Sequence, residues 1–210
     1  MVENDMFRTN RLETLTDGLF AIVMTILVLD IKLPRDINLL KTVNIEQFIT
    51  GYFQDVIVYM VVFIALAYIW FIHHAHTHIM QHTDRNHLWI NILLLMFVAL
   101  VPFSSSLVNK FPSEWLAVAI LSFNMLIIGL LAYASWAYAV KNNRLIDSNV
   151  NRAYIIAEKR RLLTFSAISL AAMILAFIYP YLSYCIFLLA PLLLFSKTLI
   201  SSKRHKQPIR

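Results

Sequence analysis

The chain is 210 residues long, 60% of its residues are hydrophobic, only 14% are charged, and the formal net charge is +6. This composition excludes an ordinary soluble domain, because the uncharged stretches that follow Glu114 and Arg161 are long enough to cross a bilayer. The basic residues lie in short segments beside such stretches, which excludes a nucleic-acid-binding face. We therefore expect an all-α integral membrane protein.

Six transmembrane helices are predicted from the apolar stretches and their charged boundaries. A helix rises about 1.5 Å per residue, so roughly 20 mostly apolar residues span the hydrocarbon layer. Pro180 separates the last two helices. We expect residues 1–210 to form one six-helix unit, with helices at about 11–33, 52–80, 87–108, 115–139, 162–179 and 181–200.

The distribution of Lys and Arg residues predicts how these helices are oriented. If the N-terminus is cytoplasmic, 14 of the 18 basic residues fall in cytoplasmic segments. Cytoplasmic loops of membrane proteins carry such an excess of positive charge. The same assignment leaves four basic residues outside and places both termini in the cytoplasm; the four are Lys32, Arg35, Lys41 and Lys110.

The first helix carries the strongest functional signal, because Asp17 and Asp30 bracket a run of only twelve uncharged residues. Ionisable groups at membrane depth are costly and usually face protein or a water-filled cavity. On a helical wheel Asp17 lies nearly opposite a narrow aliphatic stripe. The stripe consists of Leu15, Gly18, Ile22, Ile26, Leu29 and Leu33, with Arg11 at its cytoplasmic end and Thr25 at its border.

Two interpretations of this stripe remain open on chemistry alone. An apolar helix face can pack against lipid or protein, or it can form a constriction around a symmetry axis, where rings of Ile and Leu control ion passage by dewetting. Asp17 also has two interpretations. It can cap the helix start, or it can accept hydrogen bonds from donors on neighbouring helices.

The segment from Arg11 to Gly18, Arg-Leu-Glu-Thr-Leu-Thr-Asp-Gly, resembles the R-x-x-x-F-S-D signature of the transmembrane protein 175 family. That family contains the lysosomal potassium channels and their bacterial relatives. Leu15 and Thr16 replace the Phe and Ser of the signature, and Thr16 keeps the hydroxyl. The resemblance extends over residues 8 to about 110 and includes Trp70-Phe-Ile-His73-His74, Asn91 with Leu94, and Pro102-Phe103.

The resemblance implies a bacterial-type, single-repeat channel in the plasma membrane, permeable to cations and modestly selective for K⁺ over Na⁺. It implies a homotetramer in the lipid bilayer, with the first helix of each chain lining a central pore, K⁺ as the permeant ion and no cofactor. The pore constriction then falls on Ile22, Ile26 and Leu29, and the selectivity-linked hydroxyl on Thr25.

The resemblance further implies a hydrogen-bonded network that holds the first helix against its neighbours. Its members are Arg11, Thr16, Asp17, Trp70 and His73. A buried acid that faces away from the axis needs such donors. Arg11 also lies on the cytoplasmic extension of the stripe, so the pore mouth is a second location for it.

Six of the seven histidines fall between positions 73 and 87. His74, His78 and His82 repeat every four residues on one helical face, a geometry that can bind a transition metal. No Cys, Asp or Glu accompanies them on that face, so we assign no metal site and keep the three histidines as weak candidates for one. Interfacial histidines, a pH-responsive element and a metal site remain the three interpretations of the cluster.

A proton- or metal-coupled secondary transporter that uses Asp17 and these histidines is the alternative function. The chain contains no HExxH, G-x-S-x-G or CxxC motif and only three glycines, so neither catalytic nor nucleotide-binding loops are predicted. We therefore predict that the protein is not an enzyme.

Overall fold

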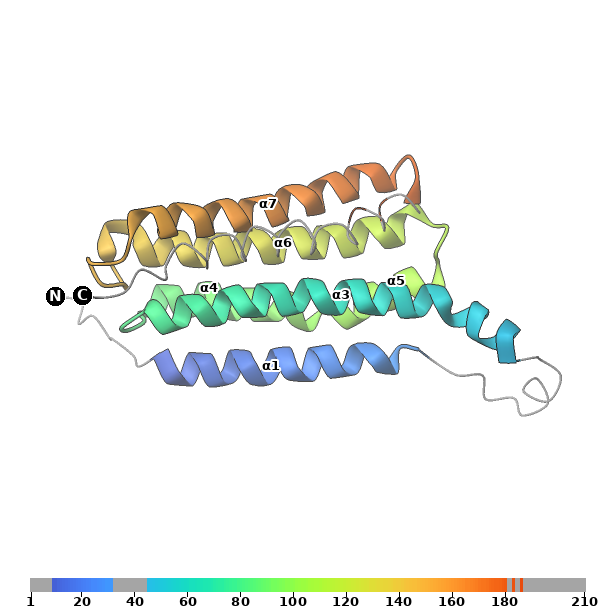
Figure 1. The fold of residues 1–210 in the computed structure, drawn as a ribbon, viewed down its shortest axis with the longest axis horizontal. Helices are drawn as coiled ribbons and strands as arrows, with labels where there is room; N and C mark the ends of the chain where they lie inside the picture. Colours follow the sequence, from blue (N-terminus) through green and yellow to red (C-terminus); the bar gives the residue numbers. More distant parts are fainter. Residues whose placement is uncertain (1–8, 32–44, 181–182, 184–185, 187–210) are drawn as a thin grey trace, which may run out of the picture.

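The structure, a computed structural model, describes residues 9–31, 45–180, 183 and 186. The described helices run side by side as an elongated bundle, with α1 at one margin and α7 at the opposite margin (Figure 1). The all-helical class predicted from the sequence is thus confirmed. The elements are α1 (Thr9–Leu29), α3 (Ile45–Ile79), α4 (Arg85–Ala99), α5 (Val101–Lys110), α6 (Trp115–Val140), a short 3₁₀ helix η1 (Lys141–Asn143) and α7 (Arg152–Ala176).

Four described helical segments are long and apolar enough to cross a membrane. They correspond to the first four predicted spans and reverse direction from one to the next (Figure 1). The fifth predicted span coincides with most of α7, which is not among the four, and the sixth, at 181–200, lies outside the described residues. The four segments are Thr9–Leu29, Ile49–Ile79, Arg85–Lys110 and Trp115–Asn143.

The third predicted helix is divided in two. We expected one helix over 87–108, whereas α4 ends at Ala99 and α5 begins at Val101. Pro102 occupies the first turn of α5 and has no N–H to donate to the preceding turn. Leu100, between the two helices, donates its N–H to the carbonyl of Phe97. Together the two halves form one segment, Arg85–Lys110, that is long and apolar enough to cross a membrane.

Helices α3 and α7 begin earlier than expected, at Ile45 rather than 52 and at Arg152 rather than 162. The start of α7 is capped by Asn151, whose side-chain oxygen accepts a hydrogen bond from the N–H of Ala153 at 2.8 Å. Charged residues in the early turns of α7 are the reason that the predicted membrane span starts only at 162. Glu158 is only 2% exposed and forms an ion pair with Arg161, so this polar segment is helical and packed.

Helices α6 and α7 pack closely at Gly129. A Cβ atom at this position would lie 2.6 Å from Oγ of Ser166 and 2.8 Å from Cδ1 of Phe165. Such distances are shorter than van der Waals contact, so only glycine fits without displacing α7.

Candidate pore surface and the polar contacts behind it

Helix α1 has one buried face and one exposed face, as its 3.6-residue period requires. The buried residues lie on the side that contacts α3, α4 and α5. They are Leu12, Thr16, Phe20, Val23 and Leu27. The aliphatic stripe lies on the other side, and its described members from Leu15 to Leu29 are all exposed in the single chain, Ile22 by 56%, Ile26 by 42% and Leu29 by 69%.

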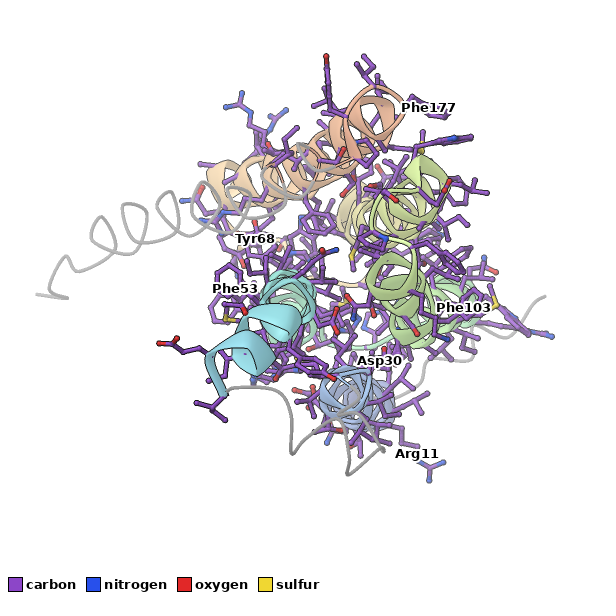
Figure 2. The ribbon with its side chains drawn as sticks, turned by 90° about the vertical axis from the view of Figure 1, so that its right-hand side faces the viewer. Arg11, Asp30, Phe53, Tyr68, Phe103 and Phe177 are labelled. Atoms are coloured by element: carbon purple, nitrogen blue, oxygen red, sulfur yellow. The ribbon has the colours of Figure 1, made fainter. Side chains whose placement is uncertain are left out.

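The view along the bundle places α1 at the margin, with the side chain of Arg11 directed away from the other helices (Figure 2). Arg11 is exposed, as the stripe's extension requires. Asp30 lies just past the end of α1 and is half-buried. From Leu15 to Leu29 the stripe is therefore an exposed, mainly aliphatic surface in the described part of the chain.

Thr25 is the one hydroxyl residue on this surface between Ile22 and Leu29. Its Oγ1 contacts the carbonyl oxygens of Ile22 at 2.8 Å and Ala21 at 3.0 Å. The hydroxyl hydrogen is thus directed at the helix backbone, which leaves the oxygen lone pairs facing outward. With its hydrogen directed at the backbone, the exposed Thr25 oxygen can coordinate a partly dehydrated cation.

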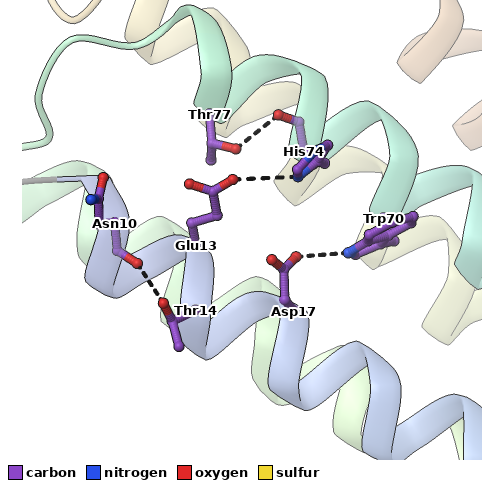
Figure 3. Close-up of polar contacts among 7 residues, drawn as sticks. All are labelled: Asn10, Glu13, Thr14, Asp17, Trp70, His74 and Thr77. Atoms are coloured by element: carbon purple, nitrogen blue, oxygen red, sulfur yellow. Dashed lines mark hydrogen bonds and ion pairs between the residues drawn. The ribbon is translucent and has the colours of Figure 1, made fainter.

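Asp17 faces the neighbouring helix rather than the exposed stripe. The indole Nε1–H of Trp70 donates a hydrogen bond to Oδ1 of Asp17 at 2.8 Å, joining α1 to α3 (Figure 3). Thr16 is also buried on this side, 1% exposed, but its Oγ1 has no hydrogen-bond partner among the described residues. Of the five residues expected in one network, the structure joins Asp17 and Trp70 directly.

His73 belongs to a second polar network deeper in the bundle. Its Nε2 lies 2.8 Å from Oδ1 of Asn91 on α4. Because this amide oxygen can only accept, His73 Nε2 carries the hydrogen. Asn91 in turn contacts His87, and Nε2 of His87 lies 2.9 Å from Oγ of Ser135 on α6. This network joins α3, α4 and α6, so His73 supports the scaffold behind α1 without contacting Asp17.

The other histidines of α3 are divided between two sides of the helix. His76 is buried, stacks on Trp136 with ring centroids 3.9 Å apart, and faces Glu158 at 3.6 Å. His74 faces α1, where its Nδ1 lies 3.4 Å from Oε1 of Glu13 (Figure 3). His78 lies edge-on against the His74 ring.

Sequence reasoning missed Glu13 because it searched for ligands only on the helix that carries the histidines. The i, i+4 spacing of Glu13 and Asp17 was the available signal, since it places both acids on the same side of α1. His82, expected on the same face as His74 and His78, lies beyond the end of α3 and is not part of their cluster.

The chain is similar in sequence and fold to known proteins. The model of the family described as endosomal/lysosomal potassium channel TMEM175 matches residues 11–102. A protein named as a potassium channel from Chamaesiphon minutus is 28% identical over 178 residues, covering 83% of this chain and 87% of that relative. An endosomal/lysosomal proton channel TMEM175 from Gallus gallus is 25% identical over 64% of this chain, which spans 28% of that longer protein.

The fold comparison covers nearly the whole length. The crystal structure of a lysosomal potassium-selective channel TMEM175 homolog from Chamaesiphon minutus superposes with a TM-score of 0.79 at 25% identity. The match covers 90% of this chain and 97% of that one.

Proposed function

Because the chain belongs to the TMEM175 family of ion channels, as a bacterial-type member with a single repeat, we propose that it is a potassium channel whose pore is lined by α1. The family consists of channels and not enzymes, and its potassium channels conduct K⁺ without a cofactor. The relatives named above support potassium as the permeant ion.

The observation that carries the pore assignment is the exposed aliphatic stripe of α1. One helix cannot enclose an ion path, so the pore requires several copies of the chain, and we propose a homotetramer around the stripe. Leu15, Ile22, Ile26 and Leu29 then become buried around a common axis instead of facing lipid. The opposite face of α1 is already packed within its own chain, which leaves the stripe free for this role.

Within this pore we propose that Ile22, Ile26 and Leu29 form the constriction and that Thr25 supplies selectivity. Rings of large aliphatic side chains exclude water and close a pore by dewetting. A ring of hydroxyl oxygens offers a dehydrating cation fewer ligands than stacked backbone carbonyls do. The expected selectivity for K⁺ over Na⁺ is therefore modest.

We further propose that the protein lies in a bacterial plasma membrane with both termini in the cytoplasm. The start of α1, the α3–α4 turn and the α6–α7 connection lie at one end of the bundle (Figure 1). This end carries Arg85, Lys141 and Arg144, as the positive-inside rule requires of a cytoplasmic side.

The test is K⁺ flux from liposomes that contain the purified protein, with Ile22→Asn compared with Val28→Asn. Val28 is exposed on α1 but lies off the stripe, so the same polar substitution there serves as the matched control. We expect K⁺ flux to rise in Ile22→Asn and to stay near wild type in Val28→Asn. Equal flux in all three proteins would refute the pore assignment, and a native mass corresponding to a stable single chain would refute the tetramer.

One observation supports a second candidate function, coupled proton transport. His73, Asn91, His87 and Ser135 form a continuous buried hydrogen-bonded chain that contains two titratable imidazoles, and the Gallus gallus relative is named as a proton channel. A pH-sensitive dye inside the same liposomes separates the two functions. Proton movement that is stoichiometric with cation movement supports a coupled transporter, whereas K⁺ flux without it supports the channel.

A further inference from the structure

Three potential metal ligands from two helices meet at the end of the bundle where α1 begins and α3 ends. The ligand atoms of Glu13, His74 and His78 all lie within 4.8 Å of one another, the only group of this kind in the part of the chain that the structure describes. We propose that Glu13, His74 and His78 bind a divalent transition-metal ion of the zinc class and thereby link α1 to α3.

The distances fit such an ion with little rearrangement. Ligand atoms about 2.0–2.1 Å from a tetrahedral zinc ion are separated from one another by about 3.4 Å. The His74 Nδ1 to Glu13 Oε1 distance is already 3.4 Å. The remaining separations lie within 4.8 Å, and His78 is exposed, so its side chain has room to rotate toward the other two ligands.

The local packing orients His74 toward this position. Its ring stacks on Trp70 with centroids 5.5 Å apart, and Trp70 is itself held by Asp17 (Figure 3). The Nδ1 atom of His74 is buried, makes no hydrogen bond among the described residues, and lies 3.4 Å from Oε1 of Glu13. A buried ring nitrogen that faces a carboxylate becomes a ligand for a cation between them when the nitrogen is deprotonated, so binding releases any proton it carries.

The ligand types select the class of metal. Two imidazoles and one carboxylate suit Zn²⁺, Co²⁺ and Ni²⁺, whereas Mg²⁺ and Ca²⁺ prefer oxygen ligands alone. Glu13 and His74 are partly exposed and His78 is exposed, so water can fill the fourth position and the ion can exchange with the solution. The site is therefore suited to reversible binding.

The position of the site separates it from the ion path proposed above. Glu13 lies half a turn around α1 from Ile22, on the side that faces α3. A bound metal would thus lie outside the pore axis. It would tie α1 to α3 one turn from the Asp17–Trp70 hydrogen bond and restrict movement of α1 relative to the rest of the bundle.

Metal binding is measured on the purified protein in detergent, so the result does not depend on conduction. Equilibrium dialysis gives the Zn²⁺ content per chain, and titration with Co²⁺ gives the visible absorption of a low-symmetry cobalt site. The variants are Glu13→Gln and His74→Gln. The matched controls are Glu46→Gln, an exposed acid at the far end of α3, and His82→Gln, the histidine outside the cluster.

We expect one Zn²⁺ per chain in wild type and in both controls, and at least about a tenfold loss of affinity in each ligand variant, since removing even an outer-shell partner typically weakens binding by about 10- to 100-fold. A thermal unfolding midpoint that rises with Zn²⁺ in wild type but not in Glu13→Gln supports the same site, and it also verifies that the variant is folded. The proposal is overturned if wild type binds no Zn²⁺, if Mg²⁺ competes equally, or if His82→Gln loses binding while Glu13→Gln retains it.

Discussion

Replacement of Trp70 by Phe removes the hydrogen bond that joins α1 to α3. Trp70 Nε1 lies 2.8 Å from Oδ1 of Asp17, and the contact is partly buried. A hydrogen bond to a charged group contributes about 1.5–3 kcal/mol. The Phe ring keeps an aromatic surface against His74, so most of the loss is the hydrogen bond itself.

The magnitude is isolated by a double-mutant cycle with Asp17→Asn. The amide oxygen of Asn still accepts from Trp70 but forms a neutral hydrogen bond of roughly half the strength. We expect Trp70→Phe to cost about 2 kcal/mol in the wild-type background and about 1 kcal/mol in the Asn background. For a chain of this size, about 2 kcal/mol lowers the unfolding midpoint by about 4–8 °C.

Far-ultraviolet circular dichroism during thermal unfolding in detergent is the appropriate assay, because it does not depend on tryptophan fluorescence. The four proteins of the cycle are compared at equal detergent and salt concentration. Equal losses from Trp70→Phe in the two backgrounds would refute the reasoning, since they would show that the charge of Asp17 adds nothing to the hydrogen bond with Trp70.

Two further substitutions test the pore surface and the packing of the bundle. Thr25→Ala removes the exposed hydroxyl, so the K⁺/Na⁺ permeability ratio from reversal potentials should fall toward one, while Thr25→Ser should preserve it; an unchanged ratio in Thr25→Ala would contradict the role of the hydroxyl. Gly129→Ala places a Cβ 2.6 Å from Oγ of Ser166 and should cost about 1–3 kcal/mol, measured as a lower unfolding midpoint; a midpoint at or above that of wild type would contradict the close approach of α6 and α7.

The division of α1 into a buried and an exposed face was predictable from sequence. Both the position of Asp17 opposite the stripe and the exposure of Ile22, Ile26 and Leu29 follow from a regular helical period, which needs no knowledge of the neighbouring helices. The predicted bounds of this helix were also accurate at its start, where the structure begins α1 at Thr9.

Helix boundaries set by tertiary packing were less predictable. A prediction that ends membrane spans at charged residues starts this helix at 162, ten residues after Arg152, where the structure begins α7. Arg152 and Glu158 then fall in the connection before the predicted span. The structure pairs Glu158 with Arg161 and places it opposite His76. The burial of Glu158 against His76 depends on which helices are neighbours, and the hydropathy of one segment does not contain that information.

The same limit applies to the polar sites. The spacing of His74 and His78 is visible in the sequence, but their neighbour Glu13 comes from another helix. His73 was expected beside Trp70 and Asp17, whereas its position on α3 directs it to Asn91. His74 lies four residues after Trp70 and faces α1 with it, whereas His73 is rotated by about 100° from His74 around α3, enough to face a different helix.

The central claim is that the exposed stripe of α1 faces a conducting pore, and substituted-cysteine accessibility tests it most directly. The sole native cysteine, Cys185, is replaced by Ser, and Cys is introduced at Ile26 or at Val28. We predict that a water-soluble, positively charged thiol reagent blocks K⁺ current through the Ile26→Cys channel and leaves the Val28→Cys channel unchanged. Full current through a modified Ile26→Cys channel would contradict the account.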